Sequence, residues 1–173
     1  MTESNINYQL ELIKNAEQGK TYIICGWRLH QEAAYNEALR CYERGLEISP
    51  NDAELWCKKG LTHHNLGENE EAEYCYKKSL SIDEDKSEAI YYLGFLMMQV
   101  VKYNKAIELF YKVIDLDKEN GMAYYYLAKA LIKEGSEREA KQLIIERMVK
   151  TYPNVEAMIL IAYGEVKNNI LDL

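Results

Sequence analysis

Residues 53–86, AELWCKKGLTHHNLGENEEAEYCYKKSLSIDEDK, decide the fold. The first half of this stretch places Trp56 and Gly60 four residues apart, and the second half places Ala72 and Tyr76 at the same spacing. Residues four apart lie on one face of an α-helix. A polar link that contains a glycine separates the two patterns. The stretch therefore predicts two helices joined by a short turn.

The same pattern recurs every 34 residues along the chain, in columns of matched side-chain size. The columns are Gly26, Gly60, Gly94 and Ala128; Ala38, Ala72, Ala106 and Ala140; Tyr42, Tyr76, Phe110 and Ile144; Tyr22, Trp56, Ile90 and Tyr124; and Leu46, Leu80, Ile114 and Met148. A small residue that faces a bulky ring lets two antiparallel helices approach closely, because the ring fills the space left by the missing side chain. One helix pair cannot bury both of its faces, so the repeats predict a stack of pairs.

This unit resembles the tetratricopeptide repeat, a helix–turn–helix of 34 residues. The resemblance rests on Trp56, Gly60, Leu66-Gly67, Ala72 and Tyr76. It implies an all-α fold, an α-solenoid that forms a right-handed superhelix in this family. We expect four repeats, at residues 19–52, 53–86, 87–120 and 121–154, followed by a C-terminal capping helix at 155–173 and preceded by a helical or frayed segment at 1–18.

The C-terminal part of the chain departs from the pattern in two ways. Lys150 replaces a column of apolar residues, which indicates that the second helix of the fourth repeat is degenerate or shifted. Residues 158–163 are apolar on every side, so this helix would expose apolar surface on a lone monomer. Either the N-terminal or fourth-repeat helices cover that surface, or two copies form a symmetric dimer through it.

Composition and charge exclude several classes of function. The net charge of −7 disfavours a protein built on phosphate contacts, so we expect no nucleic-acid partner. No stretch reaches the roughly 18–20 apolar residues of a membrane-spanning helix, and the N-terminus lacks the basic start and apolar run of a secretory signal. We therefore expect a cytoplasmic protein without membrane insertion. The four cysteines form no CxxC pair, and we interpret them as packing residues of a reduced chain.

The resemblance also indicates where a partner would bind. In this family the first helices of successive repeats line a concave surface that holds partner peptides. On the non-packing face of these helices, the candidate groove residues are Ile23, Trp27, His30, Cys57, Lys58, Leu61, His64, Asn65, Tyr91, Tyr92, Phe95, Met98, Gln99, Tyr125, Tyr126 and Lys129. Tryptophan and tyrosine bury large areas at low rotamer cost, so this surface suits a protein or peptide with apolar anchors. One tyrosine of each adjacent pair is expected to pack between repeats instead.

One group of peptides is expected not to bind. Repeats of this family that bind the acidic C-terminal tail of cytosolic chaperones share a set of Lys, Asn and Arg side chains that clamps the tail. In this chain the equivalent places hold Ile23, Trp27, Lys58, Glu88 and Tyr92. Because only one of these five residues is basic, a tail carboxylate would lack most of its charge-assisted partners.

A catalytic or metal site has weak support in the sequence. His30 and His64 are 34 residues apart with Cys57 between them, but neighbouring pairs place equivalent backbones about 10 Å apart, too far for a compact metal site. We interpret the histidines as groove residues that hydrogen-bond a partner. The chain contains no Gly-rich phosphate loop, GxSxG or HExxH motif.

The sequence thus predicts a non-catalytic protein–protein interaction module, a scaffold or adaptor, that needs no cofactor. Two alternatives stay open. The first is a secretion-type chaperone for an export substrate, because the acidity and apolar groove resemble those of such proteins. The second is a self-assembling structural subunit.

Overall fold

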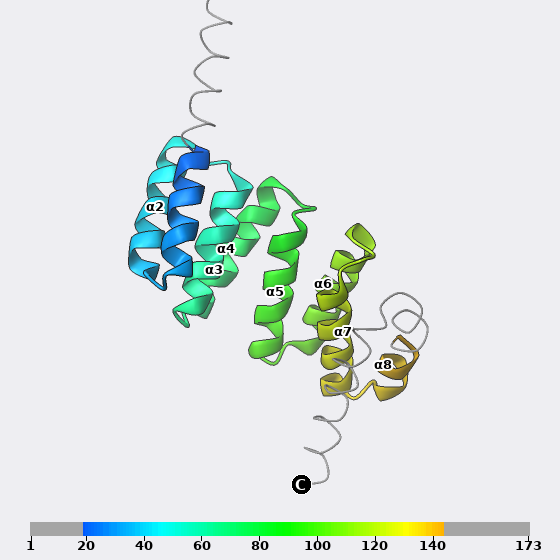
Figure 1. The fold of residues 1–173 in the computed structure, drawn as a ribbon. Helices are drawn as coiled ribbons and strands as arrows, with labels where there is room; N and C mark the ends of the chain where they lie inside the picture. The colour runs from blue at the N-terminus through cyan, green and yellow to red at the C-terminus, as the bar shows by residue number, and fades with distance from the viewer. Residues whose placement is uncertain (1–18, 144–173) are drawn as a thin grey trace, which may run out of the picture. The chain divides into compact units, whose positions relative to one another are not determined.

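The computed structural model describes residues 19–143, and every regular element among them is an α-helix (Figure 1). The helices span residues 19–31, α2 (Tyr35–Ile48), α3 (Ala53–Asn65), α4 (Asn69–Ile82), α5 (Ser87–Gln99), α6 (Tyr103–Leu116), α7 (Gly121–Glu134) and α8 (Glu137–Leu143). The all-α class is confirmed. Within this range, no helix is long and apolar enough to cross a membrane. The expectations for residues 1–18, for residues 144–154 of the fourth repeat and for the helix and dimer contact at 155–173 lie outside the described residues.

The chain divides into two compact units, Met1–Ala89 and Ile90–Leu173. In the first unit, α2 packs on α3 and α3 packs on α4. In the second unit, α6 packs on α7 and α7 packs on α8. The boundary falls inside α5, whose residues from Ile90 onward belong to the second unit.

Glycines hold the helices of a pair close together, as the repeat columns predict. The ring of an aromatic residue on the second helix lies where a side chain on the first helix would otherwise stand. These rings are fully buried. The three glycine–ring pairs are Gly26 with Tyr42, Gly60 with Tyr76, and Gly94 with Phe110. The alanine column of the second helices, Ala38, Ala72, Ala106 and Ala140, is also fully buried.

Polar side chains fix where two of the first helices begin. Asp52 Oδ1 accepts hydrogen bonds from the backbone N–H groups of Glu54 at 2.9 Å and Leu55 at 3.1 Å, at the start of α3. Asn120 caps α7 in the same way by accepting from the N–H of Ala123 at 3.0 Å. Such caps satisfy amide groups that have no partner inside the helix.

The turn inside each helix pair contains one residue in the left-handed conformation. These residues lie 34 positions apart, and they are Ala33, Gly67, Val101 and Gly135, with φ angles of 58°, 79°, 60° and 97°. Glycine adopts this conformation without steric cost, whereas a residue with a Cβ is strained there. Two of the four turns therefore carry local strain.

Candidate functional site

Most of the candidate groove residues of the first unit are engaged inside that unit. Ile23 is half-buried and packs against the core residues Ala38, Tyr42 and Leu55. Cys57 is 0% exposed and Leu61 is 8% exposed. The prediction that Cys57 and Leu61 line a partner-binding surface is therefore wrong, because neighbouring side chains already cover them.

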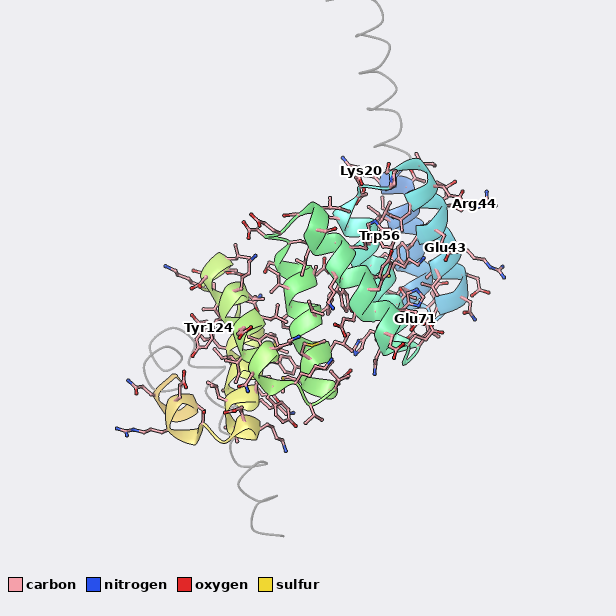
Figure 2. The ribbon with its side chains drawn as sticks, turned by 180° about the vertical axis from the view of Figure 1, so that it is seen from behind. Lys20, Glu43, Arg44, Trp56, Glu71 and Tyr124 are labelled. Atoms are coloured by element: carbon pink, nitrogen blue, oxygen red, sulfur yellow. The ribbon has the colours of Figure 1, made fainter. Side chains whose placement is uncertain are left out.

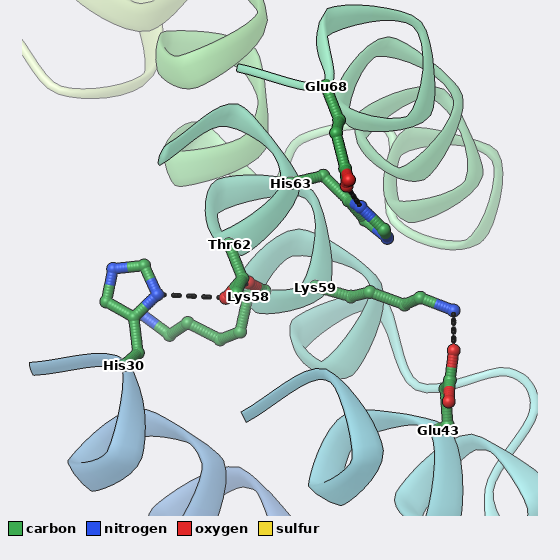
Figure 3. A network of polar contacts seen from close by, with 7 residues as sticks. All are labelled: His30, Glu43, Lys58, Lys59, Thr62, His63 and Glu68. Carbon is green, nitrogen blue, oxygen red and sulfur yellow. Dashed lines mark hydrogen bonds and ion pairs between the residues drawn. The ribbon is translucent and has the colours of Figure 1, made fainter. Parts of the chain in front are cut away.

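His30 stands at the centre of a polar network that links the helix at residues 19–31 to α3 (Figure 3). Its Nδ1 lies 2.9 Å from Thr62 Oγ1, and its Nε2 lies 3.0 Å from the side-chain amide of Asn65. The Thr62 hydroxyl donates to the backbone carbonyl of Lys58 at 2.9 Å. With that proton committed, Thr62 Oγ1 accepts from His30 Nδ1–H, and the bare Nε2 accepts from Asn65. All of these bonds require a neutral imidazole.

The electrostatics of the site agree with a neutral imidazole. His30 is 8% exposed. Burial, and secondly the positive charge of Lys58, hold the pKa of His30 below its usual value of 6.5. The ring is therefore neutral at pH 7 and serves as a bridge between two helices.

Trp27, Lys58 and Glu88 continue the network. The indole ring of Trp27 stacks on His30, with 5.1 Å between ring centroids and 14° between planes. Lys58 Nζ lies 4.6 Å from the centroid of the Trp27 ring and 2.7 Å from Glu88 Oε1. The lysine thus makes a cation–π contact and an ion pair, and its ammonium group is already bound within the unit.

This arrangement argues against a metal ion between His30 and His64. Both ring nitrogens of His30 are engaged, and the Cys57 sulfur is buried. Among residues 19–143, no three His, Cys, Asp or Glu side chains group together as metal ligands do. His64 is half-buried.

The second unit carries a cluster of aromatic rings centred on Phe110, which is fully buried. The Tyr126 ring is stacked near Phe110 with a centroid distance of 5.9 Å and an interplanar angle of 18°, and Tyr91 meets Phe110 edge-on at 6.0 Å. Tyr91 and Tyr126 are themselves 5.9 Å apart. The expectation that one tyrosine of each adjacent pair packs between helix pairs is confirmed for Tyr91 and Tyr126.

Three further half-buried rings flank this centre. The ring centroids of Phe95 and Tyr125 each lie 5.0 Å from that of Tyr126. The ring centroid of Tyr92 lies 5.5 Å from that of Tyr91. Lys129 Nζ is 5.9 Å from the centroid of Tyr125. At the end of α5, Met98 is half-buried and Gln99 is exposed.

The phenol groups at the centre of the cluster are uncharged. Burial is the main cause that raises the pKa of Tyr91 and of Tyr126 above the usual value of 10. The second unit therefore presents a centre of uncharged phenol rings, with further half-buried rings beside it. Such a surface favours contact with apolar side chains.

Sequence reasoning missed Thr62, which is fully buried and joins His30 to the Lys58 backbone. A signal was present. The equivalent positions of the third and fourth helix pairs hold Leu96 and Ala130, both buried. A hydroxyl at a position that is apolar in the next two helix pairs, although the first pair holds Arg28 there, indicates a buried hydrogen bond.

A second surface feature was also not predicted. A pocket in the first unit is lined by residues of α2, α3 and α4, namely Glu43, Trp56, Lys59, His63, Glu70, Glu71, Tyr74 and Cys75, of which Figure 2 labels three. Trp56 and Tyr74 meet edge-on at 6.0 Å. Lys59 Nζ lies 5.9 Å from the centroid of the Trp56 ring. It also lies 3.1 Å from Glu43 Oε1 (Figure 3). The pocket thus holds a cation from its own chain.

Comparisons with known families agree with the repeat pattern. Three family models match the chain, a TPR repeat at residues 26–67 and two tetratricopeptide repeat models at residues 53–86 and 102–158. Together they cover residues 26–86 and 102–158. A search of curated proteins finds no match.

Solved structures share the fold. PilF of Pseudomonas aeruginosa has a TM-score of 0.76 at 18% identity, over 88% of this chain and 72% of that one. MamA of Desulfovibrio magneticus RS-1 has a TM-score of 0.67 at 20% identity, over 88% and 94% of the two chains. The second TPR domain of human RPAP3, in complex with the HSP70 peptide SGPTIEEVD, has a TM-score of 0.62 at 25% identity, over 67% and 97%. The expected α-solenoid fold is confirmed.

Proposed function

Because the chain belongs to the tetratricopeptide repeat family, we propose that it is a protein-interaction module. In this proposal its second unit binds a partner segment through an aromatic face formed by the rings of Tyr92, Phe95 and Tyr125, next to Tyr91 and Tyr126. In the RPAP3 domain the same fold holds a peptide of another protein, which supports a protein partner here. We propose no catalytic step and no cofactor for this role.

The observation that carries the proposal is that the rings of α5 and α7 fall into two groups, one that packs against buried Phe110 and one that flanks it. Tyr91 and Tyr126 contact the buried Phe110 and so hold the helix pairs together. Tyr92, Phe95 and Tyr125 flank them and are half-buried. Rings that are held by their neighbours lose little further conformational entropy when a partner covers them.

The partner that fits this face has apolar side chains as anchors. Tyrosine and phenylalanine rings gain free energy when apolar groups cover them, and a tyrosine hydroxyl can also donate or accept a hydrogen bond. Lys129, beside Tyr125, supplies one positive charge at the rim of the face. Gln99 and Met98, at the end of α5, are the further contact residues that we propose.

In the first unit the proposal is narrower than the sequence indicated. Lys58 and Asn65 are candidate groove residues, but they are bound to Glu88 and His30. His30 itself is used internally. Trp27, Ile23 and His64 are half-buried and are the residues of this unit that we still propose as contacts.

The test uses a peptide selected for binding from a random library displayed on phage, with affinity measured by calorimetry on the purified chain. Phe95→Ala and Tyr125→Ala should each weaken binding by roughly 30-fold, the effect of losing about 2 kcal/mol at an anchor. The matched control is Tyr74→Ala, which removes a ring that is 54% exposed in the first unit. If both variants keep their fold and their affinity, the proposed face is wrong.

A further inference from the structure

Two thiols of the first unit are in contact. Cys41 Sγ lies 3.4 Å from Cys25 Sγ, and the Cys41 S–H group donates to the sulfur of Cys25. Both residues are half-buried, whereas Cys57 and Cys75 are buried. A disulfide bond is about 2.05 Å long, so the two sulfurs would have to approach by only about 1.3 Å to join.

The helix packing explains why these thiols meet. Cys25 directly precedes Gly26, and Cys41 directly precedes Tyr42. The Tyr42 ring fills the space beside Gly26, so the two helices come close at this level. The neighbouring position on each helix is therefore brought into contact as well.

Other helix pairs do not repeat this thiol pair. The positions equivalent to Cys25 and Cys41 hold Lys59 and Cys75 in the second pair and Leu93 and Leu109 in the third. The thiol pair is therefore particular to the first helix pair.

We propose that Cys25 and Cys41 form a reversible intramolecular disulfide, a modification site whose oxidant is a low-molecular-weight disulfide such as oxidised glutathione. The Cys25 thiolate attacks one sulfur of the oxidant and releases one glutathione thiolate. The Cys41 sulfur then attacks the Cys25 sulfur of this mixed disulfide and releases the second glutathione. Two protein thiols are oxidised, one glutathione disulfide is reduced, and the two thiol protons end on the two glutathione molecules. This inference does not depend on the proposed function.

The hydrogen bond sets the order of the two steps. Cys41 is the donor, so it keeps its proton while Cys25 attacks. Burial, assisted by the contact with Cys25, raises the pKa of the Cys41 thiol to about 11. Ring closure therefore needs deprotonation of Cys41 and should become faster as the pH rises.

The disulfide would also stabilise the hairpin that contains it. It encloses the 15 residues from 26 to 40, including the turn at Ala33. Closing a loop of this kind reduces the conformational entropy of the unfolded chain. The oxidised protein should therefore unfold at a higher temperature than the reduced protein.

The experiment treats the full reduced chain with oxidised glutathione, quenches the reaction with acid, and measures intact mass and digested peptides. We expect the loss of two hydrogen atoms, a peptide pair linked through Cys25 and Cys41, and full reversal by dithiothreitol. Cys57 and Cys75 serve as internal controls and should react with a maleimide only after unfolding in urea.

Two variants separate the steps. Cys41→Ser should stop at a stable glutathione adduct on Cys25. Cys25→Ser should lose the first step, the attack on oxidised glutathione. The wild-type result alone can overturn the proposal. A lasting glutathione adduct on the folded wild-type chain, a disulfide between two chains, or thiols that stay unmodified while folded would each show that the pair does not close.

Discussion

The ring of Tyr42 occupies the space that a side chain on Gly26 would need. A Cβ atom at position 26 would lie 2.5 Å from Tyr42 Cε1, well inside van der Waals contact. The same relationship recurs with looser spacing in the next two helix pairs, at 2.8 Å for Gly60 and 3.1 Å for Gly94. The three glycines thus form a graded series within one chain.

Alanine substitutions at these glycines should destabilise the protein in the order of the distances. Overpacking costs about 1–3 kcal/mol, whereas alanine gains up to about 1 kcal/mol over glycine in a helix interior. We expect Gly26→Ala to lower the free energy of unfolding most, Gly60→Ala less, and Gly94→Ala least, as measured by urea denaturation. Equal costs at Gly26 and Gly94 would show that ring contact does not set the effect.

Replacing Val101 with glycine should stabilise the protein. Val101 has a φ of 60° and its side chain is 67% exposed, so it is strained and packs little. Relief of the left-handed strain is worth about 1 kcal/mol. The matched control is Gly67→Ala, at the equivalent turn with open space around the glycine. This control should lose a similar amount, and a loss of stability in Val101→Gly would contradict the strain argument.

These two predictions mark how far the sequence reaches. The packing within a helix pair depends on side chains at fixed spacing, so the glycine and alanine columns were sufficient to predict that Gly60 faces Tyr76. The turn strain could not be predicted in the same way, because Ala33 and Val101 carry no signal for a positive φ. Only their equivalence with Gly67 and Gly135, which lie 34 residues after Ala33 and Val101 respectively, connects them.

The candidate site was predicted less completely, because its contacts join different helix pairs. The spacing placed Cys57 and Lys58 on one helix face, but burial of Cys57 depends on neighbouring helices, and Lys58 is bound by Glu88, 30 residues away. Likewise, His30 and Asn65 lie 35 residues apart in the sequence. Periodicity within one helix pair predicts a face, whereas hydrogen bonds between helix pairs depend on rotamers.

The stability of the protein should depend on pH through His30. The pKa of folded His30 is held below 6.5, and the unfolded chain takes up the proton near pH 6.5. The stability that neutral His30 contributes is therefore fully present above about pH 6.5 and is lost as the pH falls toward its folded pKa. Urea denaturation between pH 7.5 and about 5.5 should show this fall, above the range in which carboxylates titrate.

The matched variant for this prediction is His30→Gln, which keeps a donor and an acceptor but cannot titrate. It should be less stable than the wild type at pH 7, and the part of the pH slope due to His30 should disappear. An NMR titration of the imidazole would measure the pKa directly. An unchanged slope in the variant, or a pKa at or above 6.5, would contradict the neutral bridge.

The acidic chaperone peptide that the RPAP3 domain holds, SGPTIEEVD, should not bind this protein tightly. Lys58 is the one basic residue at the places that resemble the tail clamp, and its Nζ already lies 2.7 Å from Glu88 Oε1. A peptide carboxylate would have to displace Glu88 and then lie beside it, at a cost in like-charge repulsion. Calorimetry with the RPAP3 domain as positive control should give no binding in the micromolar range. Glu88→Lys releases Lys58 and reverses the charge beside it, so this variant should bind the peptide more tightly than the wild type. A micromolar affinity of the wild type, or no gain in Glu88→Lys when its fold persists, would show that the Lys58–Glu88 pair does not exclude acidic tails.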